Sequence, residues 1–432
     1  MSSKTQTTAM KEEAKPALVP KLRFPEFRGA EPWKVSRFDE VLSPVVRQRP
    51  KPAEAYLGLG LRSHGKGTFL KPLEDPAKNS MDQLYEVKAH DLIVNITFAW
   101  EGAVAIAQEC DEGALVSHRF PTYTFEKGRT APEFFRYIIL GKQFVYNLGV
   151  ISPGGAGRNR VLSKNDFLKL RVALPMPAEQ QKIAECLSSM DDLMAAQARK
   201  VDALKTHKKG LMQQLFPREG ETQPRLRFSN RVDWAVVALP EVAFFQEGPG
   251  IMAVDFHSEG VPLVRLAGVS GPVVTLDGCN YLDPAKVAQK WTHFRLEVND
   301  LLISTSATFG LSSLVTKAAA GAVFYTGLIR FRPSSERLDR GYLKIFLGSP
   351  HFGRQVETAA VGGGIKHFGP SHLKQMEIPI PPLDEQQRIA MCLSSLDALI
   401  TAETQKLEAL KIHKKGLMQQ LFPNMETCHD DQ

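Results

Sequence analysis

The sequence contains few cysteines and no long apolar run. Its five cysteines among 432 residues are widely separated, and no two of them form a CxxC pair. We therefore expect neither a disulfide framework nor a zinc site. No stretch approaches the roughly 18 apolar residues that a membrane span needs, and residues 1–20 are too polar for a signal peptide. These absences predict a cytoplasmic protein with reduced thiols and no membrane partner.

The usual catalytic motifs are also missing. The chain has no Asn/Asp-Pro-Pro-aromatic tetrapeptide of the amino-methyltransferase type and no metal-ligand spacing of histidines with carboxylates. Residues 60–66 fit the start of the phosphate-binding pattern G-x-x-x-x-G-K, but Gly67 stands where a magnesium-binding Ser or Thr is needed, and no helix is predicted after it. Residues 86–88 with Asp75 resemble a nuclease carboxylate-lysine set only faintly. We expect no catalytic residue, metal or cofactor in this chain.

The chain carries a moderate positive charge. Its 54 Lys and Arg against 47 Asp and Glu give a formal net charge of +7, and the excess lies in two long segments of mixed sequence, not in the tails. This distribution is compatible with a polyanion partner such as double-stranded DNA.

An internal repeat organises the sequence. Residues 175–217 align without a gap on residues 381–423, and 28 of the 43 positions are identical. Both copies contain Glu-Gln-Gln near the start and end in His-Lys-Lys-Gly-Leu-Met-Gln-Gln-Leu-Phe-Pro. A shorter match, Leu22-Arg23-Phe24 with Trp33, recurs as Leu226-Arg227-Phe228 with Trp234. The chain therefore consists of two copies of a variable domain followed by a near-constant segment.

Each near-constant segment is predicted to be one long helix with a heptad seam, because its apolar residues recur at alternating steps of four and three. Prolines bracket both segments, as residues excluded from helix interiors should. Gln197, Lys208, Glu403 and Lys414 interrupt the seam and are expected to fix its register. The seam residues are Ile183, Leu187, Met190, Met194, Val201, Leu204, Leu211, Leu215, Ile389, Leu393, Leu396, Ile400, Leu407, Leu410, Leu417 and Leu421.

Connectivity predicts how the two helices pair. Each is about 57 Å long at 1.5 Å per residue, whereas a compact domain of about 160 residues has a radius of gyration near 15 Å. The ends of the intervening domain cannot easily lie that far apart, as a parallel pair would require. We therefore expect an α+β protein with two mixed α/β domains separated by an antiparallel two-helix coiled coil, related by a pseudo-two-fold internal repeat.

The variable domains contain matching candidate strands and matching basic loops. Residues 91–96 and 300–304 are predicted to be equivalent buried strands, and residues 120–125 and 328–331 to be later ones. Between the last predicted strand and the long helix, both copies carry a glycine-rich loop that turns basic. The candidate DNA-contacting residues are Arg158, Asn159, Arg160 and Lys164 in the first copy, Lys366 and His367 in the second, and Arg62, His64 and Lys66 in the earlier turn. For each of them a solvated surface position is the competing interpretation.

The pattern as a whole resembles the specificity subunit of type I restriction-modification systems. The resemblance is carried by Leu-Arg-Phe-Pro-Glu-Phe at residues 22–27 with Trp33, by Pro-x-Pro-x-Glu-Gln-Gln-x-Ile at 175–183, and by Gly-Leu-Met-Gln-Gln-Leu-Phe-Pro at 210–217. The second copy keeps the last two motifs, with Leu383 in place of the second proline, but lacks the Pro-Glu-Phe of the first.

This resemblance implies a non-catalytic DNA reader. Each variable domain would recognise one half of a bipartite asymmetric target, and the helices would set the spacer and bind two modification subunits that methylate adenine N6. S-adenosylmethionine and ATP are expected in the partner subunits, the latter for translocation and cleavage by restriction subunits. A coiled-coil scaffold without DNA recognition is the alternative. The implied segments are a tail at 1–20, target recognition domains at 21–177 and 218–383, long helices at 178–217 and 384–423, and a tail at 424–432.

Overall fold

A computed structural model describes residues 17–154, 160–229, 232–305, 312–334, 336–359 and 369–423. The chain divides into two compact units. Unit 1 contains the residues up to Ala196 together with those from Glu408 onward, and unit 2 contains Gln197–Leu407. Among the described residues, no helix is both long and apolar enough to span a membrane.

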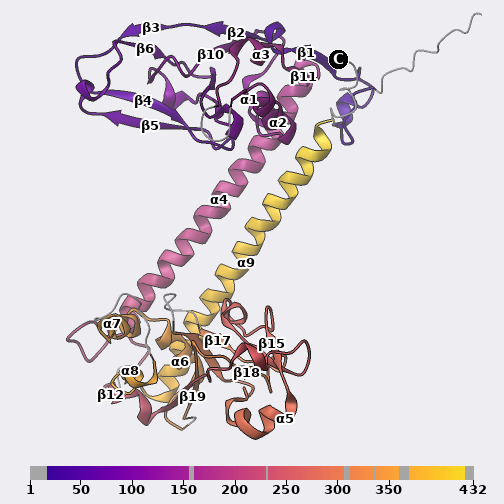
Figure 1. Ribbon diagram of the computed structural model, residues 1–432. Helices are drawn as coiled ribbons and strands as arrows, with labels where there is room; N and C mark the ends of the chain where they lie inside the picture. The colour runs from indigo at the N-terminus through magenta and orange to yellow at the C-terminus, as the bar shows by residue number, and fades with distance from the viewer. Residues whose placement is uncertain are drawn as a thin grey trace, which may run out of the picture. The chain divides into compact units, whose positions relative to one another are not determined.

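Unit 1 contains two larger sheets and one short strand pair (Figure 1). A four-stranded sheet has the order β2-β10-β7-β8, a five-stranded sheet has the order β3-β6-β9-β4-β5, and β1 pairs with β11. The strands are β1 (Lys34–Arg37), β2 (Leu42–Val45), β3 (Gln48–Pro50), β4 (Tyr56–Leu61), β5 (Thr68–Leu73), β6 (Gln83–Glu86), β7 (Leu92–Val94), β8 (Val104–Ile106), β9 (Leu115–Val116), β10 (Thr122–Phe125) and β11 (Arg171–Leu174). Its short helices are α1 (Pro132–Ile138), α2 (Lys142–Val150) and α3 (Lys164–Lys169).

Unit 2 contains a four-stranded sheet of order β13-β19-β16-β17, a three-stranded sheet of order β15-β14-β18, and the pair β12-β20. The strands are β12 (Ala235–Ala238), β13 (Ala243–Glu247), β14 (Val261–Val264), β15 (Asn280–Leu282), β16 (Leu301–Ser304), β17 (Ser312–Leu314), β18 (Val323–Phe324), β19 (Leu328–Pro333) and β20 (Glu377–Ile380). Its short helices are α5 (Pro284–Lys286), α6 (Arg340–Leu347), α7 (Pro350–Ala359) and α8 (Pro370–Leu373).

The sheets of the two units follow one plan although their sequences differ. In both four-stranded sheets, the second strand in the spatial order comes last in the sequence. This strand pairs antiparallel with both of its neighbours, the first and the third in the spatial order. The predicted equivalent strands at 91–96 and 300–304 correspond to β7 and β16, which occupy the same place in the two sheets. The repeat seen in the helices therefore extends to the variable domains at the level of topology.

The glycine-rich segments do lie between the last predicted strand and the long helix, but the sequence analysis missed the elements that follow them. These are α3 and β11 in unit 1, and α8 and β20 in unit 2. Both final strands are short and pair with the first strand of their own unit, over Lys34–Arg37 and Ala235–Ala238. A four-residue strand whose partner lies more than a hundred residues away has no local pattern that distinguishes it from loop.

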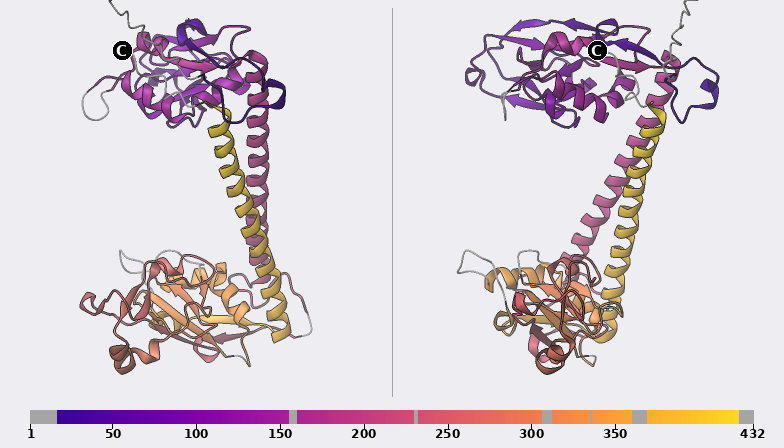
Figure 2. Two further views of the ribbon diagram at one scale, coloured as in Figure 1. Left: turned by 90° about the vertical axis from the view of Figure 1, so that its right-hand side faces the viewer. Right: turned by 45° about the vertical axis from the view of Figure 1, so that its right-hand side comes forward.

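The two long helices, α4 (Pro177–Leu215) and α9 (Leu383–Leu421), run antiparallel where segments of both occur in one unit (Figure 2). In unit 1, Leu421 shares an apolar cluster with Ile183, and Lys414, two turns back along α9, forms an ion pair with Asp191, two turns forward along α4. Unit 2 repeats the arrangement, with Leu215 and Ile389 in one cluster and Lys208 paired with Asp397. All sixteen predicted seam residues are buried or half-buried.

Each polar residue that interrupts the seam has a polar partner on the other helix segment of its unit. Besides the two lysine–aspartate pairs, Gln197 donates from Nε2 to the Glu403 side chain at 2.6 Å and to the Glu403 carbonyl oxygen at 2.9 Å. Lys200 contacts the other carboxylate oxygen at 2.5 Å. These hydrogen bonds, chiefly that from Lys200, lower the pKa of Glu403. A shift of one heptad would separate these partners, so they favour a single register.

Candidate nucleic-acid interface and its supports

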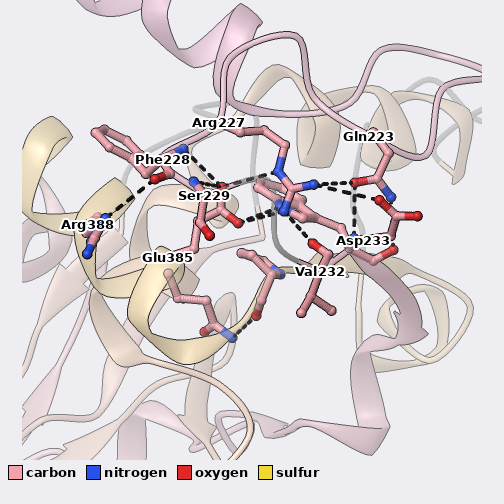
Figure 3. Close-up of polar contacts among 11 residues, drawn as sticks. Gln223, Arg227, Phe228, Ser229, Val232, Asp233, Glu385 and Arg388 are labelled. Carbon is pink, nitrogen blue, oxygen red and sulfur yellow. Dashed lines mark hydrogen bonds and ion pairs between the residues drawn. The ribbon is translucent and has the colours of Figure 1, made fainter.

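The near-constant motifs form a joint between a long helix and the entry to a variable domain, and unit 2 shows it most clearly (Figure 3). Glu385, in the first turn of α9, is fully buried. Its carboxylate accepts hydrogen bonds from Arg227 Nη2 at 2.9 Å, from Trp234 Nε1 at 3.1 Å and from the Phe228 backbone at 3.0 Å. An acidic group near a helix N-terminus is also stabilised by the helix dipole.

Unit 1 repeats the joint with the corresponding residues. Glu179, in the first turn of α4, accepts from Arg23 Nε at 2.8 Å and from Arg23 Nη2 at 2.6 Å, and both side chains are buried. Hydrogen bonding to Glu179 raises the pKa of Arg23. The Leu-Arg-Phe and Glu-Gln-Gln motifs, which lie about 155 residues apart, are thus two sides of one contact.

The glutamine that follows each glutamate ties the helix to a second part of the domain. Gln180 donates to the carbonyl oxygens of Arg129 and Pro175, and its amide oxygen accepts from the Ala131 backbone just before α1. Gln386 does the same with Arg337, Pro381 and Asp339, just before α6. Because both glutamines are completely buried, these contacts fix the direction in which the helix leaves the domain.

The last turn of each long helix packs on the variable domain of the other copy. In unit 1, Phe422 stacks on Phe134 with ring centroids 5.4 Å apart and meets Trp33 edge-on. In unit 2, Phe216 stacks on Tyr342 at 5.7 Å. Each variable domain therefore holds the start of one long helix and the end of the other, which explains why the Leu-Phe-Pro ending is repeated.

The turn containing Arg62, His64 and Lys66 connects two antiparallel strands, β4 and β5. A strand follows it, not a helix, so the nucleotide-binding interpretation of residues 60–66 is excluded on geometry as well as on sequence. His64 has a positive φ of 63°, and Gly65 and Gly67 have φ of 64° and 80°, which the tight reversal requires. The three basic side chains are exposed.

This turn rests on a short 3-10 helix at Ala99–Glu101. The His64 backbone donates to the Glu101 carbonyl oxygen at 2.7 Å, and the Ser63 hydroxyl donates to the Glu101 carboxylate at 2.8 Å. The neighbouring Trp100 ring lies 5.6 Å from the Arg160 guanidinium. The fold thus gathers sequence-predicted candidates from two distant segments around Ala99–Glu101, and our sequence analysis did not identify Trp100.

The Arg160 guanidinium contacts the end of α2. Its Nε donates to the Ser152 carbonyl oxygen at 3.2 Å and its Nη2 to the Gly149 carbonyl oxygen at 3.3 Å, at the C-terminal end of α2. A cation is favourable there because of the unsatisfied helix carbonyls. These contacts hold Arg160 against the end of α2.

The remaining candidates are distributed as follows. Lys164 is exposed at the first position of α3. Arg158, Asn159, Lys366 and His367 lie outside the described residues. Within the described ranges, no group of three or more His, Cys, Asp or Glu side chains has the proximity needed to hold a metal ion.

Comparisons with known proteins agree with the resemblance stated from the sequence. Residues 232–411 match the family model for the type I restriction modification DNA specificity domain. The chain is 26% identical to two proteins of Methanocaldococcus jannaschii, the type I restriction enzyme MjaVIII specificity subunit over 272 residues and the putative type I restriction enzyme MjaX specificity subunit over 270 residues. Each match covers 60% of this chain, and the chain spans 63% and 60% of the length of these relatives.

The fold is similar to that of two chains in solved structures. One comes from a structure concerning complex assembly and conformational transition of the type I R-M system, with a TM-score of 0.58 at 19% identity over 91% of this chain and 98% of that chain. The other is the type I restriction-modification S subunit from M. genitalium, with a TM-score of 0.55 at 14% identity over 94% and 100%. The comparisons thus agree with the resemblance to type I specificity subunits, and the similar solved structures show a mixed α+β fold.

Proposed function

We propose that this chain, which carries a type I restriction modification DNA specificity domain over residues 232–411, is the non-catalytic subunit that selects the DNA target of a type I restriction-modification complex. Residues 21–177 and 218–383 act as two target recognition domains. Each reads one half of a bipartite, asymmetric sequence in double-stranded DNA.

One observation carries this proposal: the two units share a sheet plan and a helix joint, while the sequences of their variable domains differ. The corresponding joints, each with a buried arginine–glutamate pair on Glu179 or Glu385, present the two domains in a similar manner. The different loops allow the two readers to select different bases, since sequence is read by side chains at base edges and phosphate contacts only position the protein.

The long helices at 178–217 and 384–423 form an antiparallel coiled coil between the two readers. They set the number of unspecified base pairs between the half-sites and bind two modification subunits, which methylate adenine N6 using S-adenosylmethionine. The target adenine must leave the base stack to reach such a pocket. Restriction subunits, which use ATP, complete the complex. The chain therefore acts in the cytoplasm without a cofactor of its own.

We assign the DNA contacts to the candidate residues named from the sequence. They are Arg62, His64, Lys66, Arg158, Asn159 and Lys164 for the first half-site and Lys366 and His367 for the second. Arg160 supports the first set through its contacts with the end of α2.

Reconstitution tests the proposal. Mixed with its modification subunit and with S-adenosylmethionine, the full chain should direct methylation to one split sequence, and alone it should show no methyltransferase, nuclease or ATPase activity. Sequencing of modified bases on randomised duplex DNA provides the measurement. Turnover by the chain alone above a heat-treated control, or methylation without a split motif, would refute the proposal.

A further inference from the structure

Two arginines follow an equivalent strand in the two units, at positions that differ by two residues in register against the parallel neighbour. In unit 1, β4 pairs antiparallel with β5 and parallel with β9, and in unit 2, β14 pairs antiparallel with β15 and parallel with β18. The three strands also come in the same order along the chain, so β4 and β14 are equivalent. Arg62 is the residue that directly follows β4, and Arg265 directly follows β14.

Arg62 is braced by the neighbouring strand. Its guanidinium carbon lies 5.0 Å from the centre of the Phe69 ring, and its Nη1 donates to the carbonyl oxygen of Thr68, the first residue of β5. The Phe69 ring lies over Gly60, its partner across the strands, where an added Cβ would meet ring atoms at 2.3 Å. Because Gly60 has no side chain, the Phe69 ring can lie over it and support the Arg62 guanidinium.

Arg265 is braced in the same way by different residues. Its guanidinium carbon lies 4.9 Å from the Tyr325 ring centre and 5.6 Å from the Phe256 ring centre. Its Nη1 donates to the side-chain oxygen of Asn280, the first residue of β15, at 2.8 Å. In both units one hydrogen bond and at least one aromatic face thus fix the plane of the guanidinium.

Neither arginine is neutralised by the protein. Within the described part of the chain, neither forms an ion pair, and neither Nε nor Nη2 of either residue makes a hydrogen bond. Arg62 is exposed and Arg265 is half-buried. A stable surface arginine usually pairs with a carboxylate, as Arg37 does with Asp39 and Arg225 with Glu221. Here each guanidinium is held rigidly, while the Nε–Nη2 edge is left for an external acceptor.

From this geometry we propose that Arg62 and Arg265 are equivalent base-reading residues, each recognising a guanine in its own half-site. A planar donor pair fits the O6 and N7 acceptors of guanine in the major groove, and this is the commonest specific contact between a side chain and a base. A contact made only for charge needs no such bracing, whereas recognition of a base edge requires a defined plane. The proposal rests on the proposed function and identifies two residues that would carry its specificity.

Lysine substitutions test the proposal, because they keep the positive charge but remove the planar donor pair. In the reconstituted complex on randomised duplex DNA, Arg265→Lys should reduce the preference for one G·C pair in one half-site by about 10- to 100-fold and leave the other half-site unchanged. Arg62→Lys should do the same in the opposite half-site. The controls are Arg37→Lys and Arg225→Lys, which alter exposed, ion-paired arginines in the same two units and should leave both half-sites unchanged.

The possible outcomes are separable. A wild-type complex that methylates no split motif would reject the proposed function. If that motif appears but both lysine variants keep it unaltered, or if they weaken binding equally for every sequence as a phosphate contact would, base reading by these arginines is rejected. Folding of each variant is verified by unchanged circular dichroism and by an unaltered motif in the half-site that it does not read.

Discussion

At the scale of single residues, the most consequential groups in this chain are buried and do not face DNA. Glu385 accepts hydrogen bonds from a guanidinium, an indole and two backbone amides while it is completely buried. Such a carboxylate is tolerable only with its partners, because an unpaired buried charge is costly. The same contacts therefore stabilise unit 2 and fix the direction in which α9 leaves it.

We predict that Glu385→Gln destabilises unit 2 by about 3–5 kcal/mol, because it removes the buried countercharge of the nearly buried Arg227 guanidinium and leaves only the exposed Asp233 carboxylate, 3.9 Å away. Hydrogen exchange, read separately for peptides of each unit, measures the effect. Glu179→Gln should produce the mirror result in unit 1. Glu408→Gln removes an exposed partner of Lys411 and serves as the control, with an expected change below about 0.5 kcal/mol. A loss of less than about 1 kcal/mol for both buried glutamates would contradict this account.

At the scale of elements, the long helices combine an apolar seam with paired polar residues. The seam buries apolar side chains between the helices, and the ion pairs Lys414–Asp191 and Lys208–Asp397 favour one register of the helices within each unit. These two pairs join equivalent positions of the repeat, as expected when one helix sequence pairs with its own copy. Gln197 and Glu403 are also equivalent positions, but they carry different residues that hydrogen-bond to each other. Two glutamates at these positions would repel each other, so the difference in sequence between the two copies favours pairing of the helices.

The helices provide a test of the proposed spacer. Inserting one matched heptad after Val201 and another after Leu407 adds about 10.5 Å at 1.5 Å per residue and keeps the seam in phase. Along B-DNA that length corresponds to about 3 base pairs at 3.4 Å each. We predict that the half-site sequences stay fixed while the unspecified spacer grows.

The gain in spacer length is limited by rotation, because 3 base pairs also turn the duplex by roughly a third of its repeat. Weaker binding and a smaller increase are therefore compatible with the model. A heptad in only one helix is the control, since it breaks the pairing and should abolish activity. The measurement is mapping of the methylated sites. An active double-insertion complex with an unchanged spacer would contradict the spacer model.

At the scale of the whole molecule, the chain is an internal duplication with a net charge of +7 and exposed arginines and lysines in both units. Phosphate contacts by such residues release counterions from DNA. We predict that the affinity of the reconstituted complex for duplex DNA falls linearly on a plot of log affinity against log salt concentration, with a slope near −0.9 per phosphate neutralised. Lys66→Ala should reduce that slope by about one without changing the methylated sequence. A slope indistinguishable from zero would favour the scaffold alternative.

The sequence by itself determined the repeat, the two long helices and their seam. These features are local or periodic: heptad spacing depends on residues three and four positions apart, and 28 identities without a gap need no structure to be seen. The antiparallel direction also followed from chain length alone. The resemblance to a specificity subunit rested on the same near-constant segments.

Only the tertiary structure decided how the motifs act together. Arg23 and Glu179 are 156 positions apart, and nothing in either segment indicates that they meet. The equivalence of Arg62 and Arg265 is visible only through strand pairing, because loop sequences in the variable domains diverge while the sheet plan persists. The physical reason is the same in both cases, because the residues concerned are brought together by the folded backbone and not by their neighbours in the sequence. A sheet can also keep its hydrogen-bonded strand order while most side chains on it change.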